Sequence, residues 1–164
     1  MPRHTATLCF ATTLGLVEVE SAHSGVTRVR LGSRGRPRDV GEGAALDCAR
    51  QAREQIVAYL EGALRQFTVP VDVVGTAFQQ AVWKRLLRIP YGATRSYGQI
   101  AAELGKLRAA RAVGMACRAN PVPILVPCHR VVSGDRRGQR ATGLAEIKRR
   151  LLELEREQNG QAPH

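Results

Sequence analysis

The sequence has few aromatic residues and no long apolar run. Phe, Trp and Tyr make up only 4% of its 164 residues, so a hydrophobic core must consist mainly of Leu, Val, Ile and Ala. The apolar fraction of 44% still excludes a disordered chain, and the lack of a repeat period excludes collagen-like and solenoid architectures. No stretch approaches the ~18 to 20 apolar residues of a membrane span, and Thr5, Thr12 and Glu18 interrupt any signal-peptide core. We therefore expect a globular protein with no membrane partner, which stays in the compartment where it is made.

Closely spaced cysteine pairs are also missing. The four cysteines lie far apart and form no C-x-x-C motif: Cys9, Cys48, Cys117 and Cys128. This spacing argues against a disulfide framework and against a zinc ribbon. We expect reduced thiols in a cytosolic or nuclear compartment.

Lysine is scarce although the chain is strongly basic. Lys84, Lys106 and Lys148 are the only lysines among 25 basic residues, which face 14 acidic ones and give a net charge of +11. Such an excess favours a polyanionic partner, with nucleic acid ahead of an anionic membrane. The alternative is an arginine-rich proteome with no acidic partner.

The first half of the chain has strand and turn patterning. Three strands are predicted near the N-terminus, at 7–11, 16–20 and 26–31. Residues 32–43 are rich in Gly, Arg and Pro and are predicted to form a mobile basic loop. A helix is predicted over 44–60, ended by Gly62, and a further strand over 67–74.

The second half is predicted to be helical. Thr76 can cap a helix that runs to Ile89 and stops at Pro90. The Ser-x-x-Gln capping box from Ser96 opens a short helix, predicted over Ile100 to Leu104. Another helix is predicted over 109–118. Spacing alone fits a helix-turn-helix or an ordinary helical hairpin, and the small residues that begin the last helix favour the former because they permit close approach to a groove.

The segment from Asn120 to Val132 carries the strongest chemical signal. Its three prolines predict an extended, stiff backbone that ends at Cys128 and His129, a thiol beside an imidazole. A thiolate is the nucleophilic form, and a neighbouring base favours it. Side chains of adjacent residues in an extended chain point apart, so direct contact needs a turn at this point or a bridging water. Taken alone, Cys128 would be interpreted first as an inert buried thiol.

These residues resemble a known family. Pro127-Cys128-His129-Arg130-Val131 is similar to the active-site signature of the alkylguanine-DNA alkyltransferases. Further motifs resemble that family in order and approximate spacing, at 78–83, 89–92, 96–97, 109–114 and 120–121. The resemblance is strong from Phe78 to Val132, good again from Lys148 to Glu155, and weak before Thr76. Several separated motifs are much more specific than one.

The resemblance implies an α/β (α+β) fold in two domains. A ribonuclease-H-like sheet with a helix would occupy residues 1–75. A helical, winged-helix-like domain with a helix-turn-helix would occupy 76–158, followed by a tail at 159–164.

The resemblance also implies the catalytic residues. Cys128 would attack the alkyl carbon on the exocyclic oxygen of a damaged guanine, and His129 would deprotonate it through a water. Glu155 would orient His129, and Asn120 would brace the loop. Tyr97 would contact the phosphate backbone and donate a proton toward the leaving guanine.

The DNA-binding residues follow in the same way. Arg111 would enter the duplex where the damaged base has left, and Arg118 would contact the backbone. Ala109 and Ala110 would let their helix lie close in the minor groove. Val131 and Thr142 would line the alkyl pocket.

The implied function is DNA repair by direct reversal. The partner would be double-stranded DNA that carries 6-O-alkylguanine, with 4-O-alkylthymine as a further substrate. Because a thioether offers no carbonyl to water, one molecule would repair one base and be spent. We expect a monomer with no cofactor and no metal, located in the cytoplasm or nucleoid of a prokaryote or the nucleus of a eukaryote. Two alternatives are a non-catalytic sensor of alkylated DNA, which the presence of Cys128 disfavours, and a Cys-His-Glu thiol hydrolase.

The sequence departs from the family pattern after the active-site motif. Ala141 replaces an aromatic residue in the loop 133–143, which puts the shape of the alkyl pocket and the substrate range in doubt. Three arginines in that loop could contact phosphates or only solvent: Arg136, Arg137 and Arg140. The structural zinc of some relatives is not expected, because His4, Cys9 and His23 are too few as ligands.

Overall fold

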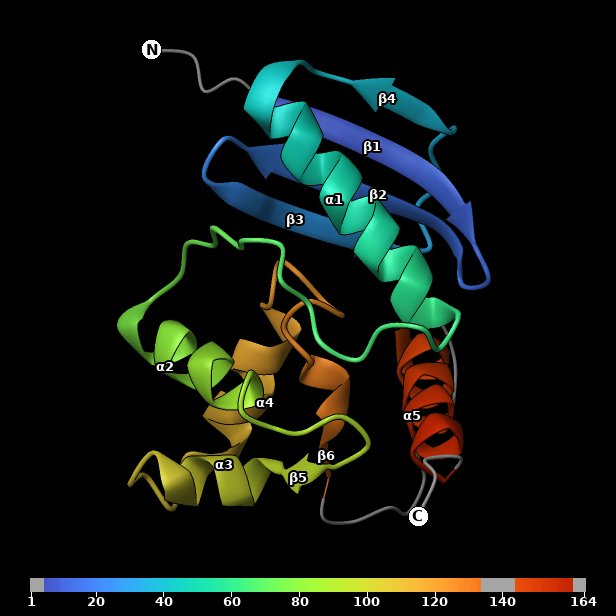
Figure 1. The fold of residues 1–164 in the computed structure, drawn as a ribbon. Coiled ribbons are helices and arrows are strands. Elements are labelled where there is room, and N and C mark those ends of the chain that lie inside the picture. The colour runs from blue at the N-terminus through green and yellow to red at the C-terminus, as the bar shows by residue number, and fades with distance from the viewer. Residues whose placement is uncertain (1–4, 134–143, 161–164) are drawn as a thin grey trace. The chain divides into compact units, whose positions relative to one another are not determined.

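A computed structural model describes residues 5–133 and 144–160 and confirms the mixed α/β class, with an antiparallel sheet and five α-helices in the described residues (Figure 1). The chain forms two compact units. Unit 1 comprises Met1–Val73 and Pro121–Leu125, and unit 2 comprises Val74–Asn120 and Val126–His164. In the described part of the chain, no helix has the length and apolar character needed to cross a membrane.

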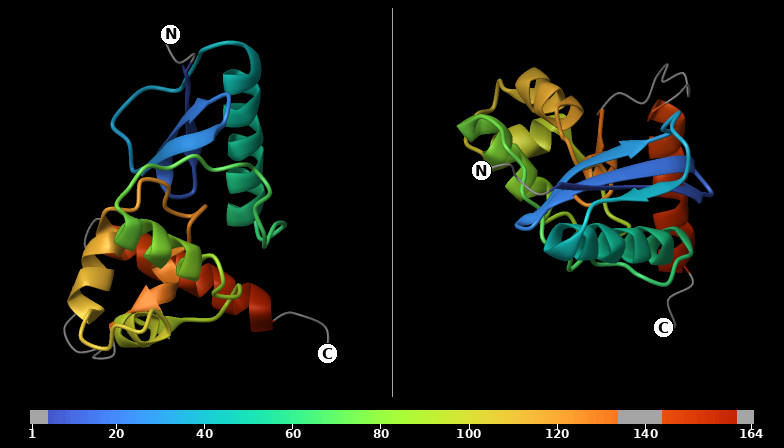
Figure 2. Two further views of the ribbon diagram at one scale, coloured as in Figure 1. Left: turned by 90° about the vertical axis from the view of Figure 1, so that its left-hand side faces the viewer. Right: turned by 90° about the horizontal axis from the view of Figure 1, so that it is seen from above.

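Unit 1 is a four-stranded sheet with one helix. The strands are β1 (Thr5–Thr12), β2 (Gly15–Ala22), β3 (Gly25–Leu31) and β4 (Arg38–Val40), in the order β3-β2-β1-β4 with every pair antiparallel. Helix α1 (Gly43–Leu60) lies along one face of the sheet (Figure 2). Fully buried residues of the strands and of α1 form the core: Leu8, Val17, Val19, Ala49, Ala52 and Ile56.

Two local predictions for unit 1 are wrong. Residues 32–43 contain β4, which pairs with β1. Residues 67–74 form no strand, and only Val71 makes an isolated bridge to Val26. Pro70 has no N–H to donate to a ladder, and the N–H groups of Thr68 and Val69 bond to the Gln55 side chain instead.

Unit 2 is mainly helical. Its elements are α2 (Ala77–Leu86), β5 (Arg95–Ser96), α3 (Tyr97–Glu103), α4 (Ala110–Arg118), a 3-10 turn η1 (Cys128–Arg130), β6 (Val131–Val132) and α5 (Leu144–Gly160). The predicted cap at Thr76 and the predicted capping box of Ser96 with Gln99 are confirmed, and Thr76 also forms a capping box with Gln79 at α2. Helix α2 ends three residues earlier than predicted. Helix α3 runs from Tyr97, directly after its cap and three residues before the predicted start at Ile100, to Glu103.

The sequence predicted an extended backbone before the active-site motif, but this segment is not extended throughout. A turn forms at Ile124–Leu125, where Ile124 has a φ of 73°. A positive φ is rare for a β-branched side chain and is strained, so the surrounding contacts must hold it. Val122, Ile124 and Leu125 are buried, and Pro121 O accepts a hydrogen bond from Val29 N at 2.8 Å. Residues 121–125 therefore belong with unit 1, whereas the sequence interpretation assigned them to the second domain.

Candidate active site

Cys128 lies in a short turn fixed by main-chain hydrogen bonds. Cys128 N donates to Val126 O at 2.8 Å, and Arg130 N donates to Pro127 O at 3.1 Å. Asn120 Nδ2 also donates to Val126 O, at 2.9 Å, and so holds the two ends of the preceding segment together. Residues Cys128–Arg130 form one 3-10 turn, so the chain bends at the point where the sequence required either a bend or a bridging water.

His129 is held by a buried carboxylate on α5. His129 Nε2 lies 2.8 Å from Oε1 of Glu155, and both side chains are almost fully buried. Glu155 also accepts from both Nε and Nη2 of Arg130, at 2.8 to 3.0 Å, and from Gly92 N at 3.1 Å. Arg130 donates in addition to Ile89 O at 2.8 Å and stacks over Tyr91. The carboxylate charge is thus balanced by one guanidinium, and the imidazole is fixed in orientation.

Burial sets the ionisation of the pair. It raises the pKa of the Cys128 thiol, an effect that a hydrogen bond from Asn120 and the charge of Lys148 oppose. It lowers the pKa of His129 despite the carboxylate of Glu155. Cys128 is therefore a thiol and His129 a neutral imidazole at neutral pH, which is the arrangement of a nucleophile with its proton acceptor.

Lys148 links this pair to Tyr97. Its Nζ donates to the carbonyl oxygen of Val131 and to the Tyr97 hydroxyl at 3.4 Å, and it lies 5.7 Å from the centre of the Tyr97 ring. Lys148, Leu151 and Glu155 share one face of α5, at i, i+3 and i+7, and that face packs against η1. The α5 face therefore supplies two of the charged groups of the site.

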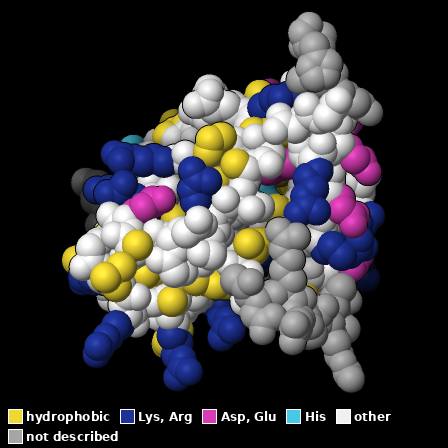
Figure 3. Space-filling view, turned by 90° about the horizontal axis from the view of Figure 1, so that it is seen from below, with side chains coloured by type: hydrophobic (Ala, Val, Ile, Leu, Met, Phe, Trp, Pro, Cys, Tyr) yellow, Lys and Arg dark blue, Asp and Glu magenta, His cyan; other side chains and the backbone are white. Residues whose placement is uncertain are grey.

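A surface hollow of about 480 Å³ lies where α3 and α4 meet. Its lining comes from the start of α3, from one face of α4 and from Ser133. The residues of the first two parts are Ser96, Tyr97 and Gly98 at the start of α3, and Ala110, Arg111, Gly114, Met115 and Arg118 on α4. Arg111, Met115 and Arg118 are exposed along that face of α4. Lys and Arg side chains stand out at several points of unit 2 when it is viewed from below (Figure 3). The hollow has the charge and the open shape that a nucleic-acid backbone requires.

The structure thus gathers the predicted site residues into two groups joined by Lys148. Cys128, His129, Glu155 and Asn120 form the first, and Tyr97, Ala110, Arg111 and Arg118 line the hollow. Val131 is fully buried next to the first group, Ala109 is the N-terminal cap of α4, and Thr142 lies outside the described residues.

The sequence reasoning missed four residues of the site. They are Arg130, Lys148, Gly92 and Met115. The charged residues on an otherwise apolar face of α5 are the signal that could have identified Lys148. No three His, Cys, Asp or Glu residues gather as metal ligands in the part of the chain that the structure describes.

Comparison with known proteins decides the family. A profile described as "6-O-methylguanine DNA methyltransferase, DNA binding domain" matches residues 77–157. The methylated-DNA–protein-cysteine methyltransferase of Mycobacterium tuberculosis is 52% identical over 105 residues. A crystal structure of the M. tuberculosis O6-methylguanine methyltransferase superposes with a TM-score of 0.82 at 38% identity, over 97% of this chain and 95% of that one. This chain belongs to the methylated-DNA–protein-cysteine methyltransferase family.

The match to the M. tuberculosis methyltransferase covers part of each chain. It spans 64% of this chain and 64% of the length of the M. tuberculosis relative. A structure of the M. tuberculosis protein in complex with DNA also matches, with a TM-score of 0.76 and 40% identity over 92% of each chain. Both groups of site residues lie within residues 77–157, which the family profile covers.

Proposed function

We propose that this protein repairs DNA by transferring an alkyl group from the O6 atom of guanine to Cys128. The observation that carries the proposal is the buried His129–Glu155–Arg130 cluster, which presents a neutral imidazole beside the Cys128 turn. Family membership supplies the substrate class, and the basic hollow at α4 fits its polyanionic carrier.

The transfer requires one proton to leave the thiol and one to reach the guanine. His129 takes the proton of Cys128, directly or through a water, and Glu155 stabilises the imidazolium that forms. Sγ then bonds to the alkyl carbon as the bond from that carbon to O6 breaks. Tyr97 supplies a proton to the departing guanine, and the Lys148 ammonium beside the hydroxyl stabilises the phenolate. The product is a thioether on Cys128, which water does not hydrolyse, so each molecule acts once.

The damaged base must leave the stack before Cys128 can reach it. Extrusion costs a few kcal/mol of lost stacking and pairing. Arg111 is exposed on α4 at the hollow, and we propose that it occupies the space left in the duplex. Ala109, Ala110 and Arg118 then lie against the DNA backbone. One chain carries every residue used here, so we propose a monomer that acts wherever the DNA is held, the cytoplasm or nucleoid in a prokaryote.

The intact mass of the protein after incubation with a duplex containing O6-methylguanine tests this function. We expect one CH₂ on Cys128 per molecule and no turnover. Cys128→Ser should bind the duplex and gain no mass, because a hydroxyl supplies no nucleophile at neutral pH. An unchanged mass with retained binding would identify a sensor, and continued turnover a hydrolase.

The role of Arg111 is tested by comparing two substrates. Arg111→Ala should slow single-turnover transfer from the duplex far more than transfer from free O6-alkylguanine base, which needs no extrusion. Equal slowing on both substrates would assign Arg111 to the pocket or to the fold instead.

A further inference from the structure

The sheet of unit 1 carries a concentration of arginine on one face. Five of the eleven residues from Arg28 to Arg38 are arginine and none is acidic: Arg28, Arg30, Arg34, Arg36 and Arg38, here called the basic face. Neither the catalytic group nor the α4 hollow includes any of them.

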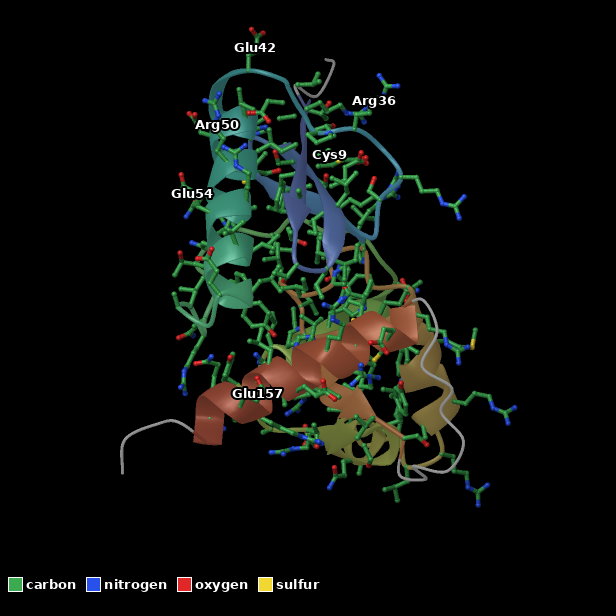
Figure 4. The ribbon with its side chains drawn as sticks, turned by 90° about the vertical axis from the view of Figure 1, so that its right-hand side faces the viewer. Cys9, Arg36, Glu42, Arg50, Glu54 and Glu157 are labelled. Atoms are coloured by element: carbon green, nitrogen blue, oxygen red, sulfur yellow. The ribbon has the colours of Figure 1, made fainter. Side chains whose placement is uncertain are left out.

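The strand register places this face on the side of the sheet away from α1. Arg38, Cys9, Glu18 and Arg30 are successive cross-strand partners on β4, β1, β2 and β3. The neighbouring positions along β1 and β2 point the other way and are buried against α1. Figure 4 shows Glu42, Arg50 and Glu54 on the α1 side and Arg36 on the other side, with Cys9 between them.

A buried carboxylate fixes two of the five arginines. Glu18 is only 5% exposed, and it lies 3.2 Å from Nη2 of Arg38 and 3.5 Å from Nη1 of Arg30. The side chains of Arg30 and Arg38 remain about half exposed. Three strand spacings of ~4.8 Å separate their backbones by about 14 Å, close to the ~12 Å width of the major groove of B-DNA.

The other three arginines are free to bind an anion. Arg28, Arg34 and Arg36 are exposed, and no carboxylate among the described residues lies within ion-pair distance of them. Guanidinium groups bind phosphate in a bidentate manner and are weakly hydrated, which suits them to a phosphate backbone.

We propose that the basic face is a second DNA-contacting surface, on which Arg28, Arg34 and Arg36 bind backbone phosphates without reading sequence. The proposal rests on the proposed function, because that function makes DNA the polyanion this protein meets. Contacts of this kind raise affinity for any duplex and leave the chemistry at Cys128 unchanged.

The test measures binding of an undamaged duplex as a function of salt concentration. Each phosphate contact contributes about 0.9 to the slope of log K against log salt. Arg36→Gln should reduce the slope by the contribution of about one phosphate contact. The triple change of Arg28, Arg34 and Arg36 to Gln should reduce it by the contribution of about three. The matched control is Arg50→Gln, which removes the same charge from an exposed position of α1, on the side of unit 1 opposite Arg36. All variants should react with free O6-alkylguanine base at the wild-type rate.

An unchanged slope in the triple variant overturns the proposal, and so does an equal effect of Arg50→Gln, which would show a net-charge effect only. If the triple variant lost binding to phosphatidylserine vesicles but kept the wild-type salt dependence of DNA binding, the proposal would be overturned in favour of a membrane surface as the partner. The proposed function is tested separately, by the increase in the intact mass of the protein when Cys128 is alkylated. Normal alkyl transfer together with an unchanged salt slope in the triple variant would refute only the role of the basic face. A reduced salt slope in a protein that transfers no alkyl group would refute only the repair activity.

Discussion

Glu155 is the residue on which the site depends most. It is 1% exposed and accepts hydrogen bonds from Arg130 and Gly92 while holding His129. Arg130 is buried as well, so each of the two charges offsets the desolvation cost of the other. The residue that orients the imidazole therefore also contributes to the stability of unit 2.

Glu155→Gln should lower the free energy of unfolding by about 3–5 kcal/mol, because it leaves the buried Arg130 charge uncompensated. Urea unfolding measures the loss. Glu157→Gln is the control, since Glu157 is exposed two residues further along α5, and it should change stability by less than about 0.5 kcal/mol. Similar losses in the two variants would contradict the role of Glu155.

The lowered pKa of His129 predicts how stability depends on pH. The unfolded chain binds a proton at His129 below its ordinary pKa of about 6.5, whereas the folded protein binds one only at lower pH. The contribution of neutral His129 to the free energy of unfolding is complete above about pH 6.5, and it is lost as the pH falls through the pKa of His129 in the folded protein. Denaturant unfolding between about pH 5 and 7 should show that decline, and His129→Gln should reduce it. Identical pH slopes in the two proteins would refute the assignment.

At the scale of elements, the loop Tyr91–Ala93 is fitted closely against α5. Gly92 has a φ of 80°, and a Cβ built there would lie 2.7 Å from Cγ of Asn159. Gly105 has a similar φ of 72°, with nothing within 4 Å of such a Cβ. Both glycines therefore need a positive φ, but only Gly92 has a side chain, that of Asn159, in the space that a Cβ would occupy.

Gly105→Ala should cost about 1–2 kcal/mol for the left-handed backbone alone. Gly92→Ala should cost about 1–3 kcal/mol more, because Asn159 must move and the bond from Gly92 N to Glu155 is disturbed. Chemical denaturation compares them. Adding Asn159→Ala to Gly92→Ala should recover part of the difference, and equal costs at the two glycines would show that α5 does not confine the loop.

Local patterns in the sequence predict the elements whose cause is local. The capping boxes at Thr76 and Ser96 fixed the starts of α2 and α3, because cap and partner are three residues apart. Strand β4 and the irregular course of 67–74 depend on residues far away, β1 for the former and Gln55 for the latter. Cys128 and His129 were found as neighbours in sequence, whereas Arg130 and Lys148 acquire their roles only through contact between η1 and α5.

At the scale of the whole molecule, unit 1 is built from two separate stretches of chain. Residues 121–125 enter it with Val122, Ile124 and Leu125 buried and with a hydrogen bond from Val29 N to Pro121 O. Burial of each such side chain contributes about 1.5–3 kcal/mol. This segment can hold unit 1 even when the connection at residue 74 is broken.

A protease site inserted before Val74, which is 83% exposed, tests this expectation. After cleavage, fragments 1–73 and 74–164 should elute together in size-exclusion chromatography at micromolar concentration. Val122→Asp should make them separate, because it places a charge in the core of unit 1. Independent elution of the unmodified fragments would show that residues 121–125 contribute little to unit 1.

The return of the chain through unit 1 has a consequence for recombination. The turn at Ile124 is part of the core of unit 1, yet it is encoded within the stretch that also specifies Cys128 and α4. A crossover at residue 74 would therefore place a foreign sheet against the resident Val122 and Ile124. Functional chimeras must exchange two stretches at once, so the sheet and the active-site segment are expected to diverge together.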